Sequence, residues 1–401
     1  MEEIKPRYLV MVAATENRNK YYKQIPHGDR WTAEYGRVGS SPQRREYPMS
    51  QWDSKYREKL RKGYVDQTDL VEDLISVEKP KSSEYKEIEN KVIAEIVQRL
   101  QDLARKAVSE NYTISSNKVT QAMVDEAQDI LTSLLDISDI NIFNDTLLKL
   151  FTTIPRKMKN VQDCIAKSKE DFSKIIQKEQ DLLDVMKGQV VSKQIIDESI
   201  EENQKSENTI LEHLGLVFEE CNSNDIATIK AALGTCTDRF KQAWRVTNIK
   251  TQKRFDEFIK NEKITNTKLL WHGSRNENWW SIINTGLVLR PTNAVITGKM
   301  FGYGIYYAPK AQKSLGYTSF GYWTRGNAPF GFMALMNVAY GKPYDVYSFD
   351  GKYYNFNYER LQQNCPGANC LHAHAGSMLR NDEIIVYKEE QCTIKYLVEL
   401  Q

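Results

Sequence analysis

The feature that most constrains the fold is the scarcity of helix breakers in the middle of the chain. Residues 81–205 contain a single proline, Pro155, and a single glycine, Gly188, which is far below the usual frequency of either type. Apolar residues recur there at three- and four-residue steps, as in the run Val119, Met123, Ala127, Ile130 and Leu134. Such spacing places apolar side chains on one face of a helix. We therefore predict an all-α bundle whose core is formed by these apolar stripes.

The first 79 residues have a different pattern. Short runs that alternate between apolar and polar residues are typical of strands, and a helical pattern follows from Ser50 to Leu60. Ser50 is the predicted N-cap of that helix, and Gly63 is the predicted stop. We expect a small sheet with one helix packed on it.

The last part of the chain, residues 207–401, is again rich in glycine and aromatic residues. Strand-like runs are separated by glycine-containing loops, and Asp225–Phe240 and Asn278–Ile283 have the patterns of helices. A mixed α+β domain fits this sequence. We therefore expect a multidomain α+β protein with boundaries at 1–79, 80–206 and 207–401.

The distribution of charge and the spacing of the cysteines indicate the compartment in which the protein is found. The whole chain has a formal net charge of only +2, but residues 1–64 hold fourteen Lys or Arg against eight Asp or Glu. This basic N-terminal part precedes a bundle with more acidic than basic residues. Six cysteines without regular spacing are typical of reduced thiols inside a cell, and neither a secretory signal nor an apolar run of about 20 residues is present. We expect an intracellular protein without membrane partners.

Three stretches of the last domain carry the chemistry. They are Trp271–Arg275 at the end of an apolar strand, Thr297–Tyr317 with its glycines and tyrosines, and Asp382–Tyr387. Taken singly, each has a structural explanation, because a lone histidine, a tyrosine pair or a glutamate at a strand start is common. In order and spacing, the three together closely resemble the transferase signature of the poly(ADP-ribose) polymerases.

The resemblance implies an NAD⁺-dependent ADP-ribosyltransferase fold over residues 207–401 and assigns roles to its residues. His272, Tyr317 and Glu383 are the implied catalytic residues, and no metal is required. Tyr306 and Tyr317 would flank the nicotinamide ring, and Glu383 would stabilise the positive charge that develops on the ribose, as in glycoside cleavage. The implied residues that bind NAD⁺, as co-substrate, are His272, Gly273, Ser274, Tyr306, Tyr307, Ser314 and Tyr317.

Two further features follow from the same resemblance. A donor loop is implied at about Arg290–Gly302, and its glycines and proline suit a mobile lid. A glutamate at the third catalytic position, Glu383, is typical of family members that extend ADP-ribose chains. Three functions remain open at this point: a polymerase, a mono-ADP-ribosyltransferase, and a catalytically silent scaffold that binds DNA ends.

The N-terminal part resembles a WGR domain, the DNA-contacting module of DNA-activated members. The motif reads Glu34–Gly39, with Tyr35 where the family has tryptophan. DNA with strand breaks or ends is thus the implied partner, beside protein acceptors that include the chain itself. The alternative is an ordinary solvated basic face. The residues expected to contact DNA are Tyr35, Arg37, Lys20, Lys23, Arg44 and Arg45.

The bundle resembles the helical regulatory domain that blocks NAD⁺ access until DNA binds. Ser115–Ala122 and Leu147–Arg156 carry this resemblance. A DNA-associated location follows, in the nucleus of a eukaryote or in the cytoplasm or nucleoid of a bacterium.

One local cluster lies outside the family pattern. Cys365, Cys370, His372 and His374 have the spacing of zinc ligands, and His372 and His374 would point the same way on a strand. A variable loop that leads into the Glu383 strand is the favoured interpretation, with a metal site as the alternative. Close to this cluster, Asp382 stands where the family commonly has asparagine.

Overall fold

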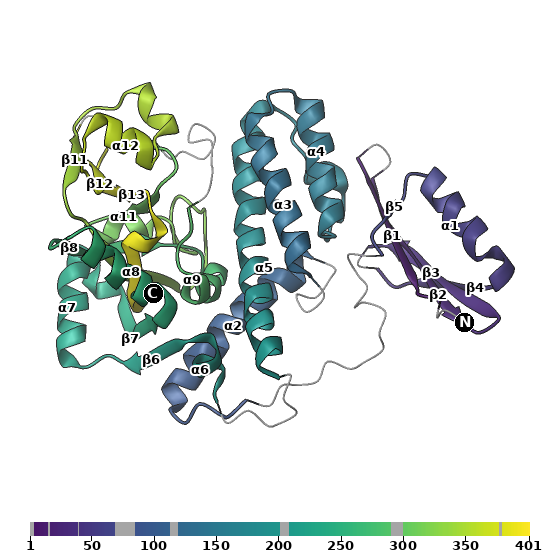
Figure 1. Ribbon diagram of the computed structural model, residues 1–401, viewed down its shortest axis with the longest axis horizontal. Coiled ribbons are helices and arrows are strands. Elements are labelled where there is room, and N and C mark those ends of the chain that lie inside the picture. The colour runs from purple at the N-terminus through teal and green to yellow at the C-terminus, as the bar shows by residue number, and fades with distance from the viewer. Residues whose placement is uncertain are drawn as a thin grey trace. The chain divides into compact units, whose positions relative to one another are not determined.

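The computed structural model describes residues 4–14, 17–38, 40–68, 85–112, 119–200, 208–289, 300–376 and 379–401, without the side chains of 192–200. The chain forms two compact units, whose elements are labelled in Figure 1. The first contains Met1–Ser82 and Arg105–Val191, and the second contains Ser83–Ala104 and Ser192–Gln401.

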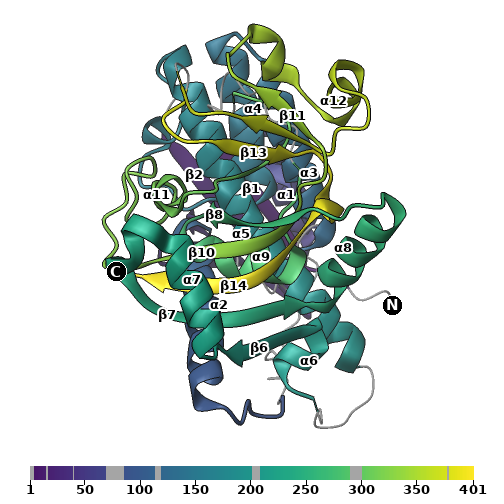
Figure 2. The ribbon, with the colours of Figure 1, turned by 90° about the vertical axis from the view of Figure 1, so that its left-hand side faces the viewer.

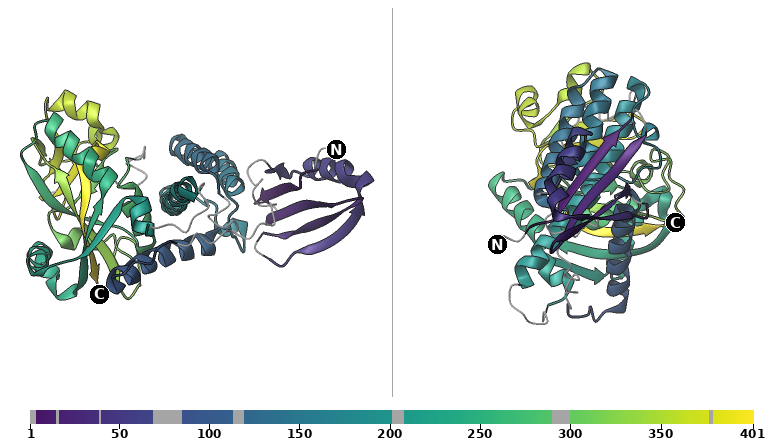
Figure 3. Two further views of the ribbon diagram at one scale, coloured as in Figure 1. Left: turned by 60° about the horizontal axis from the view of Figure 1, so that its bottom comes forward. Right: turned by 90° about the vertical axis from the view of Figure 1, so that its right-hand side faces the viewer.

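The first unit begins with an antiparallel five-stranded sheet of order β4-β3-β2-β1-β5. Its strands are β1 (Arg7–Ala13), β2 (Arg18–His27), β3 (Arg30–Arg37), β4 (Gln43–Pro48) and β5 (Val65–Asp66), and helix α1 (Trp52–Arg61) covers one face (Figure 3). Trp31 and Trp52 meet edge to face, with ring centroids 5.5 Å apart, and both are buried. The predicted sheet with one helix is therefore observed.

The predicted N-cap of this helix was wrong by one residue. Ser50 lies in a 3-10 turn, Met49–Gln51, and α1 follows with Gln51 at its N-cap position and no side-chain cap. The turn begins directly after Pro48, whose extended backbone ends β4, so the chain tightens before the α-helix starts. Gly63 does stand at the predicted stop, with φ of 85°, a value that glycine adopts without strain.

The helices predicted for the middle of the chain are observed. They are α2 (Lys91–Asn111), α3 (Gln121–Ser133), α4 (Ile140–Thr153) and α5 (Phe172–Ile200). Thr120 caps α3 by accepting a hydrogen bond from the Met123 amide. The buried face of α3 uses Leu131 rather than the predicted Ile130, a shift of one residue along the stripe. Arg156 and Glu179 form a buried ion pair of 3.0 Å that joins the segment after α4 to α5.

The second unit contains an antiparallel five-stranded sheet of order β6-β7-β14-β10-β8. Its strands are β6 (Leu216–Glu220), β7 (Phe240–Asn248), β14 (Cys392–Leu400), β10 (Gly331–Ala339) and β8 (Thr267–Gly273). Strand β10 is buried almost throughout, with Phe332, Leu335 and Val338 at 0% exposure. The helices on this part are α6 (Ile210–Leu214), α7 (Ser223–Leu233), α8 (Ile249–Asn261) and α9 (Trp279–Thr285).

The predicted helix Asp225–Phe240 was too long. The α-helix ends at Leu233, because Gly234 takes a positive φ of 55°, and a 3-10 segment continues to Arg239. Phe240 is the first residue of β7. The predicted helix Asn278–Ile283 corresponds to α9, which is preceded by a 3-10 turn, Asn276–Asn278.

A second sheet of four strands has the order β11-β12-β13-β9 (Figure 2). These strands are β11 (Pro343–Val346), β12 (Cys370–Ala373), β13 (Glu383–Val386) and β9 (Ile305–Tyr307), and β11 and β12 form the one parallel pair among the described strands of this sheet. Two further helices among the described residues are α11 (Ala311–Leu315) and α12 (Tyr358–Asn364). The mixed α and β structure expected for this part of the chain is confirmed.

The first half of α2 belongs to the second unit through a buried charge. Glu399 of β14 is fully buried, and both Arg99 nitrogens reach its carboxylate at 3.0 and 2.7 Å, while Lys241 adds a third contact of 3.0 Å. Burial alone would raise the pKa of Glu399, but these hydrogen bonds outweigh it and hold the pKa below its usual range. The first half of α2 is therefore anchored to the last sheet, although the boundaries at 79 and 206 stay a prediction.

Within the described ranges, no helix combines the length and the apolar character that crossing a bilayer demands.

Candidate active site

The three sequence stretches meet where the two sheets of the second unit join. Trp271 of β8 and Ala308, just after β9, exchange backbone hydrogen bonds of 2.9 and 3.0 Å. This bridge brings the end of β8 beside β9, and β9 in turn pairs with β13, so that Tyr306 lies opposite Ile385. The site is thus built from strand ends, which the sheets hold in fixed positions.

Glu383 is the first residue of β13 and is only 8% exposed. Its carboxylate is paired with the ammonium group of Lys313, which lies in the last turn of α11. A buried carboxylate normally requires such a partner, because desolvation of a lone charge is costly. The pair holds the Glu383 carboxylate at this position of the site.

Sequence reasoning assigned no role to Lys313. The residue lies inside a stretch that was singled out, four positions before Tyr317. The signal that could have identified it is a lysine within a stretch predicted to lie beside Glu383, because a buried carboxylate needs a partner of opposite charge.

Two tyrosines lie near this charge pair. Tyr306 donates its hydroxyl to the Gly302 carbonyl at 3.1 Å and accepts from the Phe301 amide at 3.0 Å, so its ring is fixed. The ring of Tyr317 is 44% exposed. Burial, and then the charge of Glu383, raise the pKa of Tyr317 to about 12, so the phenol stays neutral at physiological pH. One fixed ring and one accessible ring therefore lie near Glu383.

His272 lies one residue before the end of β8. Its Nδ1 is 3.1 Å from the Tyr306 carbonyl oxygen, and its ring meets those of Trp279 and Tyr307 edge to face at 6.4 and 6.0 Å. Tyr307 itself is only 2% exposed. The structure therefore places Tyr307 behind His272, as a support for the imidazole rather than at the surface of the site.

Gly273 and Ser314 fix the distance between β8 and α11. A Cβ atom at Gly273 would collide with the backbone carbonyl oxygen of Ser314. The Ser314 hydroxyl donates to the Trp271 carbonyl at 3.0 Å, and Ser314 is 4% exposed. In this structure the hydroxyl therefore holds α11 against β8. Ser274 accepts a hydrogen bond of 2.9 Å from the Asn278 side chain.

The predicted donor loop, Arg290–Gly302, lies largely outside the described residues. Its last part is described, and there Gly302 has a φ of 72° and packs directly on the backbone of Phe356. A side chain at this position would therefore meet both strain and a collision.

The residues predicted to contact DNA lie in the first unit and do not share one face. Side chains alternate along a strand, and the register pairs Lys23 with Glu34 and Glu34 with Arg44. Lys23 and Arg44 therefore lie on one face, on either side of the acidic Glu34, which pairs with Arg44 at 3.0 Å. The other four predicted DNA contacts lie on the opposite face of the sheet, which α1 covers. They are Lys20, Tyr35, Arg37 and Arg45.

Arg37 is engaged with backbone carbonyls rather than exposed as a ligand for phosphate. Its guanidinium donates to Asn17, at both the backbone and side-chain oxygens, and to the carbonyls of Met158 and Lys159. The bonds to Met158 and Lys159, 3.2 and 2.6 Å long, join the N-terminal sheet to the segment after α4. Tyr35 packs against the α1 core and is partly buried, with its ring 6.1 Å from that of Tyr22.

The four-residue cysteine and histidine set is not assembled. His372 and His374 do point the same way, with ring centroids 3.9 Å apart. Cys370 is fully buried and donates to the Tyr340 carbonyl, and among the described residues neither Cys365 nor Cys370 joins a group of metal-ligating atoms. The favoured interpretation, a variable loop that leads into the Glu383 strand, was incomplete as well, because His372 lies in strand β12 and not in a loop.

The site lies within a segment that matches a known family. A profile of the poly(ADP-ribose) polymerase catalytic domain matches residues 223–401. That range includes β8, β9, α11 and β13, which carry the candidate residues.

Two viral proteins of similar length to the matched segment resemble this chain. The uncharacterized protein 101L of Invertebrate iridescent virus 6 is 32% identical over 234 residues, which are 56% of this chain and 94% of that protein. The poly [ADP-ribose] polymerase-like protein 100L of the same virus is 32% identical over 189 residues, 46% of this chain and 97% of that protein. Poly [ADP-ribose] polymerase 1 of Arabidopsis thaliana is 28% identical over 209 residues, 50% of this chain but 20% of that protein.

Proposed function

The chain belongs to the poly(ADP-ribose) polymerase family, and on that premise we propose that it is a polymerase activated by DNA breaks. The catalytic domain at residues 223–401 supports ADP-ribosyl transfer with NAD⁺ as substrate. The proposal adds three statements: acceptors include the chain itself, ADP-ribose chains are extended, and DNA ends stimulate the reaction.

The observation that carries the proposed chemistry is the buried Glu383–Lys313 pair beside Tyr306 and Tyr317. Cleavage of NAD⁺ breaks the bond between the nicotinamide nitrogen and the ribose carbon, and nicotinamide leaves as a neutral molecule. The ribose then resembles an oxocarbenium ion, which a nearby carboxylate stabilises. Glu383 supplies this carboxylate, and Lys313 holds it in place.

The remaining residues of the site position NAD⁺. Tyr306 and Tyr317 would flank the nicotinamide ring, with offset stacking worth about 1 kcal/mol for each ring. The backbone of Gly273 would hold the carboxamide, because the missing Cβ lets the ring approach the main chain. His272, supported from behind by Tyr307 and Trp279, would bond the adenine-side ribose.

Chain extension follows from a second task of Glu383. The acceptor in elongation is a ribose hydroxyl, which must lose its proton as its oxygen bonds to the ribose carbon of the next unit. A carboxylate at hydrogen-bonding distance can accept this proton. A mono-ADP-ribosyltransferase is the second candidate, and it uses the same cleavage step without the repeated one.

DNA activation is proposed for the first unit. Lys20 and Arg45 on the α1 face are exposed and can meet phosphates, whereas Arg37 links the sheet to the bundle. Binding of a DNA end on this sheet could thus reach residues 105–191 through the bonds of Arg37. The bundle would act as the regulatory element, as its resemblance implies.

The test is an incubation with NAD⁺ labelled in its adenylate part, with and without nicked or blunt DNA, followed by gel electrophoresis. We expect a ladder of heavy products that is at least tenfold stronger with DNA. A single sharp product would favour mono-transfer, and equal ladders in both samples would contradict activation by DNA. No labelled product in either sample would leave the scaffold as the better explanation.

A further inference from the structure

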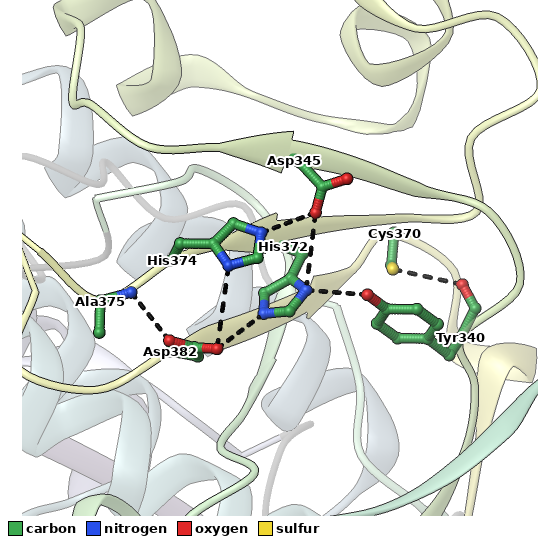
Figure 4. A network of polar contacts seen from close by, with 7 residues as sticks. All are labelled: Tyr340, Asp345, Cys370, His372, His374, Ala375 and Asp382. Atoms are coloured by element: carbon green, nitrogen blue, oxygen red, sulfur yellow. Dashed lines mark hydrogen bonds and ion pairs between the residues drawn. The ribbon is translucent and has the colours of Figure 1, made fainter.

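A cluster of two histidines and two aspartates lies on the second sheet of the C-terminal unit (Figure 4). Asp345 on β11 and His372 on β12 are register neighbours in the parallel pair, so their side chains share a face. His374 follows just beyond β12, and its amide donates to the Val346 carbonyl at 2.8 Å. Asp382 immediately precedes β13.

Three of these side chains converge on one point. Asp345 Oδ1 is 2.7 Å from His374 Nε2 and 3.7 Å from His372 Nδ1. One ligand atom from each of the three residues lies within 4.8 Å of the others. Ligand atoms around a tetrahedral zinc ion, each about 2.1 Å from the metal, are separated by about 3.4 Å. The three atoms are therefore spaced closely enough to share one ion after small rotations of the rings.

A second observation indicates that this arrangement is built for a ligand. The other nitrogen of His372, Nε2, is 3.0 Å from Asp382 Oδ2, and Asp382 Oδ1 accepts from the Ala375 amide at 2.8 Å. A histidine that binds a metal usually donates its second N–H to a carboxylate in this way. The bond places a proton on Nε2. The lone pair of Nδ1 is then an acceptor for the Tyr340 hydroxyl, which a metal ion would displace, and Nδ1 lies 3.7 Å from Asp345 Oδ1 (Figure 4).

The surroundings hold both imidazoles in place while leaving that of His374 accessible. The two histidine rings stack at 3.9 Å, and Tyr347 stacks on the outer face of His374 at 4.4 Å with an angle of 7°. The Tyr340 hydroxyl reaches His372 Nδ1 at 2.8 Å. The side chains of His374 and Asp345 are 24% and 43% exposed, so an ion can arrive from solvent.

We propose that Asp345, His372 and His374 form a binding site for a divalent transition metal of the zinc type, with a solvent molecule as fourth ligand. Two imidazoles and one carboxylate suit zinc, whereas Mg²⁺ and Ca²⁺ prefer sites made of oxygen ligands. The ion replaces the proton that His374 Nε2 shares with Asp345, and that proton leaves to solvent. Cys365 and Cys370 take no part.

The place of this site in the fold indicates its role. The ion links β11 to β12, and His372 is bonded to Asp382, the residue directly before Glu383. Ala373 of β12 also pairs with Glu383 across the strands. Metal binding therefore braces the end of β13 that carries the candidate catalytic carboxylate, without contact between the ion and the reacting atoms. The inference does not depend on the proposed function, since metal binding is measured without NAD⁺.

The test is a zinc titration of the full chain in competition with a chromophoric chelator, together with a Co²⁺ titration followed by visible absorption. We expect one tight equivalent of zinc per chain, and for Co²⁺ the absorption of four-coordinate nitrogen and oxygen ligation. His374→Gln and Asp345→Asn should each weaken zinc binding at least tenfold. Both side chains are partly exposed, so the variants should unfold within a few degrees of the parent chain without metal.

His27→Gln is the matched control, because His27 is exposed on the first unit, outside the cluster. It should bind zinc like the parent chain. Absence of a tight equivalent in the folded parent chain would overturn the proposal. So would a tight equivalent that His374→Gln and Asp345→Asn leave unchanged, or one that is lost in His27→Gln.

Discussion

Replacing Glu383 with glutamine is expected to lower the turnover of NAD⁺ by about 10²–10³-fold, with a much smaller change in KM. Glutamine has nearly the same shape but no charge, so it cannot stabilise the positive charge that develops on the ribose. The charge matters only as the bond breaks, and the loss therefore falls on kcat. The measurement is nicotinamide release at saturating NAD⁺.

Glu359→Gln is the control for this prediction. Glu359 lies exposed on α12 and bonds only the Gln363 side chain among the described residues, so its charge should not affect the reaction. Thermal unfolding of Glu383→Gln should also be followed, because the change leaves Lys313 without its partner. A folded Glu383→Gln chain with the turnover of the parent would remove Glu383 from the proposed mechanism.

Gly273→Ala is expected to reduce kcat/KM for NAD⁺ by about 10²-fold and the free energy of unfolding by about 1–3 kcal/mol. The new methyl group would collide with the carbonyl oxygen of Ser314 and would lie 2.9 Å from its carbonyl carbon. Helix α11 must then move away from β8. That shift displaces Lys313 and Tyr317, and with them the charge and the ring that face NAD⁺.

The matched control is Gly351→Ala, because a Cβ at Gly351 meets no atom within 4 Å. Steady-state kinetics and urea denaturation of both variants provide the comparison. If Gly273→Ala retained the parent kcat/KM, the close approach of β8 and α11 would not be needed for the site.

The sequence predicted the elements of the site better than its contacts. The three stretches were identified by order and spacing, and the structure brings His272, Tyr306, Tyr317 and Glu383 to the junction of two sheets. The sequence did not predict the direction in which individual polar side chains point. The Ser314 hydroxyl, for example, donates to the Trp271 carbonyl, because packing of α11 on β8 turns it inward.

Long-range pairing was the least predictable feature. Asp345 lies far from His372 in the sequence, and only the parallel pairing of β11 with β12 brings the two together. A period-two pattern shows which residues share a strand face, but not which strand lies next to it. For the same reason, the alternative metal site grouped His372 with cysteines that are close in sequence, whereas the fold places the Asp345 carboxylate beside it.

The burial of residues in β13 also depends on the neighbouring strands of the sheet, and not on the sequence pattern of the strand alone. Taken alone, the alternation along Glu383–Tyr387 predicts one core face, with Ile384 and Val386, and an opposite face with Glu383 and Ile385, yet every residue of β13 is buried. Strand β13 lies between β12 and β9, and Ile385 and Tyr387 pack in a second core with Phe301 and Leu371. A strand that is covered on both faces loses the alternation on which the prediction depended.

The central claim is that the chain transfers ADP-ribose, and the most direct measurement uses NAD⁺ labelled separately in its nicotinamide and adenylate parts. Released nicotinamide and adenylate label bound covalently to protein are counted in the same reaction. We predict that the two rise together in nearly equal amounts. Nicotinamide release with the adenylate label left in free ADP-ribose would show hydrolysis instead of transfer, and release of neither would contradict the proposed activity.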